Sequence, residues 1–146
     1  MKLAEMLYRL AIALWVGGNA LFTLVLTPLL FKTETRDTAG RIVGTFFPGY
    51  FRWGLACGGI ALFCRLLSRG RGIDLAAGIL MVMLALTAVQ SYYVEPRAAA
   101  IKREIVSFET TPKDHPLRKE FSKLHGVSAV CNLIVLGGGV VLVLLL

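Results

Sequence analysis

The chain has 146 residues, of which 56% are hydrophobic and only 17% charged, a composition that excludes an ordinary soluble domain. A mean hydropathy of +0.70 instead predicts an integral membrane protein with one domain, residues 1–146, and no room for a separate soluble module. The formal charge of +7 does not indicate nucleic-acid binding, because the basic residues stand at the ends of apolar runs, where they meet lipid headgroups.

The first predicted span covers about residues 6–31. Its basic start resembles a secretory signal, but the apolar run from Leu10 to Phe31 is longer than a signal-peptide core and no small-x-small cleavage site follows it. We therefore expect the span to remain in the mature protein as a helix. Within it, Trp15 and Asn19 share one helix face around a Gly-Gly pair. This face predicts either a packing notch for a neighbouring helix or a ligand contact through Asn19.

The second predicted span, about residues 41–64, carries a single charge in its apolar run. Pro48 and Gly49 interrupt the run, and Arg52 follows them. If the helix breaks at Pro48, Arg52 lies near the interface and extends its charged group to water. If the helix continues, Arg52 needs an acidic partner, for which we predict Glu95.

The third predicted span, about residues 74–94, begins at Asp74, a residue type that caps helix N-termini. Pro96 marks the interface at the far end of the span. Apolar residues then recur every three or four positions, which predicts an amphipathic extension over about residues 97–108.

Gln90 is the most polar residue inside the third span. On a regular helix it shares one side with Thr87 and Tyr93. We interpret this stripe as interhelical packing and hydrogen bonding, with the lining of a pocket as the alternative.

The fourth predicted span, about residues 121–146, follows the turn-rich segment TTPKDHP and begins with three polar side chains. His125, Ser128 and Asn132 are spaced i, i+3 and i+7, which places them within one arc of roughly 60° on a helix. Such a stripe is either a binding site or a set of interhelical hydrogen bonds. The run Gly137–Gly139 further along predicts close helix packing.

His125 has the widest chemical scope of the residues in the spans, because neutral imidazole binds haem iron or copper and relays protons. The alternative is a hydrogen-bonded structural histidine near the interface. Soft partner ligands could come only from methionines or from Cys57, Cys64 and Cys131. Those cysteines lie in apolar runs, which is typical of small buried hydrophobic residues and not of a disulfide framework.

Signatures of soluble catalysis are missing from the sequence. It has no phosphate-binding glycine loop, no paired intramembrane carboxylates and no recognisable nucleophile with its base, so we predict no catalytic residue.

Four spans place both termini on one side of the membrane. Residues 32–41 and 97–123 hold ten Lys and Arg, whereas the N-terminus and residues 65–71 hold five. The longer segment also carries acids, and the shorter loop is denser in arginine. The positive-inside rule therefore leaves the orientation open.

A family resemblance is carried by short motifs spread over most of the chain. They are Trp15-Val-Gly-Gly with Phe22 and Pro28, Ala39-Gly40 with Phe46 and Tyr50, and Phe121-x-x-Leu-His125-x-x-Ser-x-x-x-Asn132. In this combination the chain resembles the transmembrane protein 205-like family, small four-helix membrane domains of unknown biochemical function. More distantly, it is similar to membrane domains of the copper-resistance D and protoporphyrinogen oxidase types, which use histidines in their helices. The first resemblance implies that Trp15, Gly18, His125, Ser128 and Asn132 belong to one shared central feature.

These observations predict an all-α fold, an integral membrane four-helix bundle that crosses a bacterial inner membrane several times. The expected function is that of a non-catalytic subunit or of a component that binds a small ligand. Its expected partners are the lipid bilayer and other membrane subunits or a second copy of the chain. The alternative is a haem- or copper-binding redox or transport protein with His125 as metal ligand. The candidate cofactor- or ligand-binding residues are His125, Ser128, Asn132, Asn19, Trp15, Gln90 and Arg52.

Overall fold

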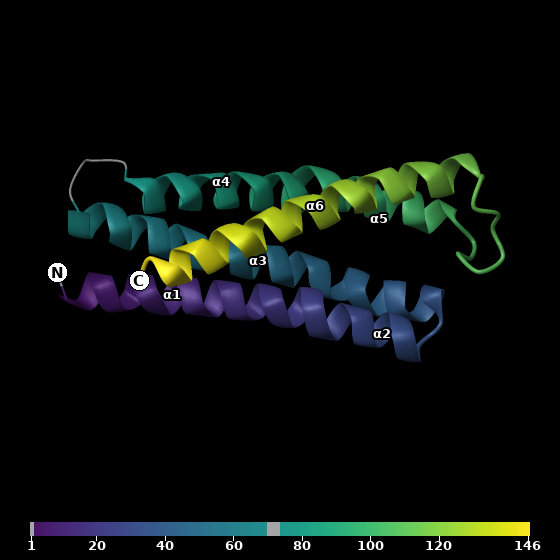
Figure 1. Cartoon of the computed structure of the whole chain (residues 1–146). Helices are drawn as coiled ribbons and strands as arrows, with labels where there is room; N and C mark the ends of the chain where they lie inside the picture. The colour runs from purple at the N-terminus through teal and green to yellow at the C-terminus, as the bar shows by residue number, and fades with distance from the viewer. Residues whose placement is uncertain (1, 70–73) are drawn as a thin grey trace.

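The computed structural model describes residues 2–69 and 74–146, which form four long helical spans (Figure 1). In chain order the elements are α1 (Lys2–Ala20), the π-helical segment η1 (Leu21–Leu26), α2 (Thr27–Thr33), α3 (Arg36–Arg69), α4 (Leu75–Val89), the π-helical segment η2 (Gln90–Val94), α5 (Glu95–Glu104) and α6 (Pro116–Leu144). The first three elements make one continuous span, and α4, η2 and α5 make another. All four spans are long and apolar enough to cross a bilayer, which confirms the predicted all-α membrane bundle.

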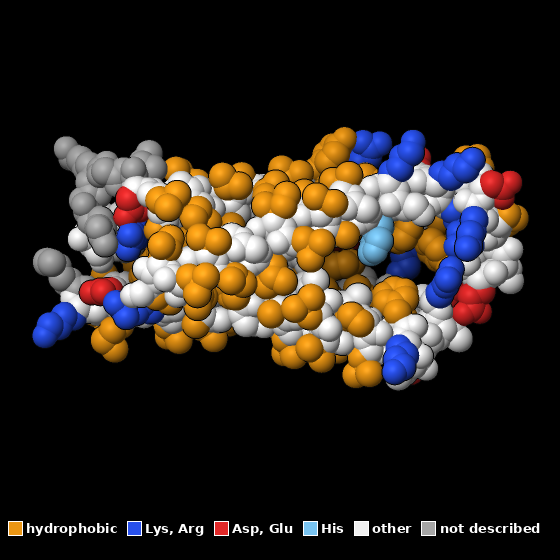
Figure 2. Space-filling view, viewed as in Figure 1, with side chains coloured by type: hydrophobic (Ala, Val, Ile, Leu, Met, Phe, Trp, Pro, Cys, Tyr) orange, Lys and Arg blue, Asp and Glu red, His pale blue; other side chains and the backbone are white. Residues whose placement is uncertain are grey.

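The outer surface of the bundle is suited to lipid. Figure 2 shows hydrophobic side chains over the middle of the visible face, with charged side chains gathered at the two ends. Large apolar residues such as Leu24, Phe63 and Val130 are more than half exposed. A continuous apolar surface of this size is stable in hydrocarbon and not in water. The protein is therefore a multi-pass membrane protein in contact with the lipid bilayer.

The four spans pack as a ring of antiparallel neighbours. α1 lies against α3, α3 against α4, α4 against α6, and α6 against α1 (Figure 1). Ile12, Leu80 and Leu142 fill the centre and are at most 1% exposed. Because α3 and α6 occupy opposite corners of this ring, the side of α3 that points away from the core has no covering helix among the described residues.

Each π-helical segment ends two residues before a proline. η1 precedes Pro28 and η2 precedes Pro96, and each is followed by a backbone hydrogen bond to the carbonyl five residues earlier. Proline lacks an N–H group and clashes with the carbonyl four residues before it, and a wider turn relieves both problems. The helix therefore continues past Pro96 and is not interrupted there.

Three helix boundaries differ from the sequence pattern. α3 runs unbroken through Pro48, so of the two alternatives for this span the continuous helix is the one that forms. The amphipathic extension predicted over residues 97–108 is helical only to Glu104, where α5 ends. α6 begins at Pro116, the last residue of the turn-rich segment. The predicted cap at Asp74 is confirmed, since its Oδ1 accepts the backbone N–H of Ala77 at 2.9 Å.

Two tryptophans set the distance between α1 and α3. Trp15 is 3% exposed and lies over two glycines of α3, so that a Cβ at Gly54 would stand 2.8 Å from its Nε1 and a Cβ at Gly58 2.4 Å from its Cζ3. In the opposite direction, Trp53 of α3 lies over Gly18, where a Cβ would be 3.3 Å from Nε1 of Trp53. The packing notch predicted on the first span is therefore present and has a second half on α3.

Candidate functional site

Asn132 is the centre of a polar cluster that joins three spans near the middle of the bundle. Its Oδ1 accepts hydrogen bonds from the hydroxyl of Tyr50 at 2.5 Å and from Nδ2 of Asn19 at 3.4 Å. Its Nδ2 donates to Oγ1 of Thr23 at 2.5 Å, and Thr23 donates to Oδ1 of Asn19 at 3.1 Å. Unpaired polar groups are costly in a dry bundle, so these bonds hold α1, η1, α3 and α6 in one arrangement.

Sequence reasoning named Asn132 and Asn19 among the candidate residues but did not include Tyr50 or Thr23. The ring of Tyr50 stacks on Phe22, with centroids 4.5 Å apart and planes inclined by 23°. In the sequence, Tyr50 was noted only as part of the motifs that carry the family resemblance. Thr23 lies four residues after Asn19, about one helical turn. That i, i+4 spacing was the one signal that could have identified Thr23.

Gln90 and Ser128 form a second polar link, between η2 and α6. Oγ of Ser128 donates to Oε1 of Gln90 at 3.0 Å, and Gln90 is 1% exposed. Because Gln90 begins a π-helical segment, the next inward residue is Val94 and not Tyr93. Tyr93 is 55% exposed and accepts a hydrogen bond from Arg97 at 2.6 Å, so its predicted place in the stripe is wrong.

The chemistry of these polar groups is that of neutral amides and hydroxyls. None of the hydrogen bonds in the two links, among the residues that the structure describes, involves a carboxylate, an imidazole or a thiol. Such groups orient helices and donate or accept hydrogen bonds, whereas general acid–base catalysis needs a group that titrates near the working pH.

His125 does not share the environment of Ser128 and Asn132. It is exposed on α6 and stacks parallel to the ring of Phe121, with centroids 6.1 Å apart and an interplanar angle of 8°. In the described part of the chain no group of three or more His, Cys, Asp and Glu residues is placed to hold a metal ion. His125 therefore does not belong to a metal site of three or more such ligands within the described part of the chain. Cys57 and Cys64 are buried in the core and free, and Cys131 is partly buried and free.

Arg52 lies on the exposed side of α3, in the middle of the helix. No ion pair joins it to Glu95, and it has no hydrogen-bond or ionic partner elsewhere in residues 2–69 and 74–146. The predicted Arg52–Glu95 pair is therefore not formed. The unbroken helix keeps Arg52 at depth, and its exposed position on α3 turns it away from the core.

Arg52 belongs to a regular stripe that sequence reasoning missed. The stripe, called here the outward face of α3, consists of Thr45, Gly49, Arg52, Ala56, Gly59 and Phe63, all of them exposed. Their spacing alternates between four and three residues, the pattern with which one helix packs along another. A Cβ at Gly49 or Gly59 would meet nothing within 4 Å, so the fold of this chain does not require glycine there.

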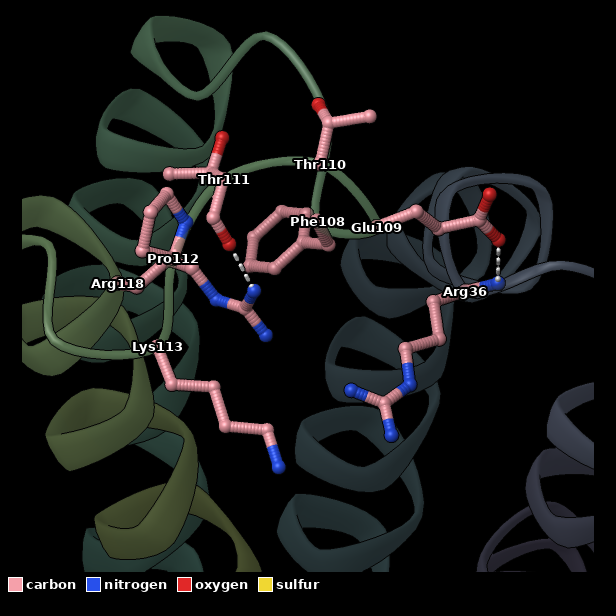
Figure 3. Close-up of a pocket in the computed structure, with 8 residues that line it drawn as sticks. All are labelled: Arg36, Phe108, Glu109, Thr110, Thr111, Pro112, Lys113 and Arg118. Atoms are coloured by element: carbon pink, nitrogen blue, oxygen red, sulfur yellow. Dashed lines mark hydrogen bonds between the residues drawn. The ribbon is translucent and has the colours of Figure 1, made fainter.

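A basic pocket of about 450 Å³ lies at the end of the bundle where α3 begins and the 105–115 segment turns back (Figure 3). Its lining residues are Arg36, Phe108, Glu109, Thr110, Thr111, Pro112, Lys113 and Arg118. Sequence reasoning assigned the 110–116 segment only to turn chemistry and so missed this pocket. No local pattern joins Arg36 to a loop some 75 residues later in the chain.

Comparison with known proteins finds relatives without an assigned activity. Residues 10–107 match the family profile described as "Domain of unknown function (DUF4149)". A relative from Aquifex aeolicus (strain VF5), described as "Uncharacterized protein", is 35% identical over 132 residues, which cover 88% of this chain and 87% of that protein. No solved structure matches the chain.

These matches do not support the resemblance to the transmembrane protein 205-like family or to copper-resistance D domains. They do cover the first three spans and, through the Aquifex protein, most of the chain. The protein is therefore a member of the DUF4149 family.

Proposed function

We propose that this protein is a non-catalytic subunit of a membrane complex, and that the outward face of α3 holds a transmembrane helix of another protein. The observation that carries the proposal is Arg52, a charged side chain that is exposed in the middle of a membrane span and has no partner among the described residues. The polar cluster around Asn132 supports the same role, because it stiffens the bundle with hydrogen bonds between three of its spans.

The depth of Arg52 makes its exposure costly. Arg41 lies 11 residues before it and Arg65 13 residues after it on the same helix, so it stands about 16 and 20 Å from the two charged ends at 1.5 Å per residue. An arginine at the helix centre costs about 2.5–3.5 kcal/mol on insertion scales. Extension of the side chain towards water covers only part of such a distance. A partner that neutralises the charge would remove this cost.

The chemistry of the partner follows from the charges of this chain. Of its nine Asp and Glu residues, only Glu95 lies well inside a span, nine residues before the end of the span at Glu104, and the others lie in loops or near helix ends. A second copy packed on the same face would bring one Arg52 towards another without a carboxylate between them. The complementary occupant is therefore a helix of a different protein, with an Asp or Glu near mid-membrane.

The outward face also has the shape that a close-packed helix requires. Gly49, Ala56 and Gly59 leave the backbone of α3 accessible on both sides of Arg52. Small residues of this kind are enriched where helices associate in membranes, because they let two backbones approach. The face thus combines one charge for specificity with small residues for contact.

Site-specific photocrosslinking in native membranes tests this function. A photoreactive amino acid at Ala56, on the outward face, is expected to crosslink to a partner peptide that contains an Asp or Glu within an apolar span. The same probe at Val130, which is 58% exposed on α6, is the matched control and should yield no such product. Arg52→Leu should abolish the product and Arg52→Lys should retain it.

A crosslink from the Ala56 position to a second copy of the chain would refute the proposal, as would a partner span without a carboxylate. Crosslinks to lipid alone would refute it too, since they would show that hydrocarbon covers the face.

The haem- or copper-binding function of His125 stays a prediction that no observed contact favours. It is tested by the optical spectrum and metal content of protein purified from haem- and copper-replete cells. A Soret band or stoichiometric copper that is lost in His125→Ala would establish it. For the cellular location we propose the bacterial inner membrane, which membrane fractionation with an antibody to the chain would test.

A further inference from the structure

We infer that the basic pocket at the start of α3 binds a phosphate group, supplied either by the headgroup of an anionic phospholipid or by a soluble phosphate. This site is separate from the outward face of α3, and its test does not depend on the proposed subunit role.

Three cations from two distant parts of the chain meet in this pocket. Arg36 is the first residue of α3, Lys113 lies in the loop before α6, and Arg118 lies in the first turn of α6. In Figure 3 the charged ends of all three side chains point into the same open space between the loop and α3. Like charges repel, so an anion that lay between them would make this arrangement more favourable.

The one acidic residue in the pocket does not supply that anion. Oε1 of Glu109 accepts the backbone N–H of Arg36 at 3.3 Å, and Figure 3 shows its side chain directed to that N–H and away from the three cationic groups. Arg36 and Lys113 have no ion pair or side-chain hydrogen bond within the described ranges. Their N–H groups are therefore available to a ligand.

Arg118 is held in place by contacts that leave part of its guanidinium free. Its Nη1 donates to the carbonyl of Thr111, and its Cζ lies 5.6 Å from the centroid of the Phe108 ring. A guanidinium presents five N–H donors, and a planar fork of this kind suits the oxygens of phosphate. An oriented arginine loses less side-chain freedom when it binds.

The segment that carries Lys113 and Arg118 is itself fixed to α3. Oδ1 of Asp37 accepts the backbone N–H of Phe108 at 2.7 Å, and Oδ2 of Asp37 accepts the hydroxyl of Ser107 at 2.5 Å. These bonds hold the loop against the start of α3 in the absence of any ligand. The pocket is therefore built by the fold, and it lies at a charged end of the bundle (Figure 2), where an anionic bilayer surface would present phosphates.

Two binding measurements on the full chain test this inference and identify the source of the phosphate. In the first, the protein in nanodiscs of phosphatidylcholine with phosphatidylglycerol is analysed by native mass spectrometry for retained phosphatidylglycerol. In the second, detergent-solubilised protein is titrated with inorganic phosphate in a calorimeter. Each is performed on the native protein, on Arg36→Gln with Lys113→Gln, and on a control that removes the same charge elsewhere at this end of the bundle.

The control variant is Arg103→Gln with Lys119→Gln, two exposed residues that do not line the pocket. At about 1 kcal/mol per cation near an anionic surface, we expect the pocket variant to bind about thirtyfold more weakly and the control to change much less. A loss only in nanodiscs identifies the lipid headgroup, and a loss only in the titration identifies soluble phosphate. Equal effects of the two variants, or no binding in either measurement, would overturn the inference.

Discussion

Trp15 and Gly58 pack so closely that a Cβ at Gly58 would lie 2.4 Å from Cζ3 of the tryptophan. The contact joins α1 to α3 in the core, where Trp15 is 3% exposed. A tryptophan ring is rigid, and Leu84 closes the other side of the site, with its Cδ2 at 2.7 Å from the same position. The buried tryptophan ring cannot withdraw without moving a helix.

We therefore expect Gly58→Ala to destabilise the bundle by about 1–3 kcal/mol, the usual cost of overpacking a core. Gly59→Ala is the matched control, because a Cβ there meets nothing within 4 Å and alanine favours the helix by up to about 1 kcal/mol. Reversible unfolding in mixed micelles measures both variants. If the two changed stability equally, the close contact described here would be incorrect.

The hydrogen bond from Tyr50 to Asn132 should show a measurable coupling. Hydrogen bonds between membrane helices contribute about 0.6 kcal/mol on average and up to about 1.7 kcal/mol. A double-mutant cycle of Tyr50→Phe with Asn132→Leu should give a coupling energy in that range. In the control cycle Ser128→Ala replaces Asn132→Leu, and the two side chains belong to different hydrogen-bonded groups, so the coupling should be within about 0.5 kcal/mol of zero. Similar couplings in both cycles would argue against a direct Tyr50–Asn132 bond.

Asp74 both caps α4 and pairs with Arg65, and two substitutions separate these roles. Its Oδ2 accepts Nη2 of Arg65 at 2.6 Å, while Oδ1 caps the backbone N–H of Ala77. Asparagine keeps a capping oxygen and loses the charge, whereas alanine loses both. We expect Asp74→Ala to cost about 1 kcal/mol more than Asp74→Asn in thermal unfolding. The loss in Asp74→Asn should be under about 1 kcal/mol and should shrink in high salt, because the pair is partly exposed.

Arg52 should make the α3 segment harder to insert into a membrane. In a translocon-based insertion assay of residues 36–69, Arg52→Leu should lower the apparent insertion free energy by about 3 kcal/mol. Arg41→Leu, near the end of the same helix, removes the same charge and should have a much smaller effect, because Arg41 reaches the headgroups. Equal effects would place Arg52 near the interface and remove the reason for a mid-membrane partner.

The sequence correctly predicted that lipid surrounds this protein, because hydropathy is a local property. Four apolar runs of sufficient length were enough to expect four spans, and the run from Leu10 to Phe31 was correctly assigned to a helix. The cap at Asp74 was also predictable, since a capping side chain acts on the backbone three residues ahead of it. The notch at Trp15 could be read from neighbours on one helix face.

Features that depend on how one helix is rotated against another could not be predicted from the sequence. Tyr93 left its predicted stripe because a π-helical turn before Pro96 shifted the inward positions, and His125 belongs to neither the polar link of Ser128 nor the polar cluster of Asn132. The basic pocket needs Arg36 beside a loop far along the chain, and Arg52 faces outward because α3 stays helical through Pro48. Whether a segment spans the membrane depends on the hydropathy of that segment alone. The direction of each polar side chain depends instead on how the helices pair, and only the packed tertiary structure specifies that pairing.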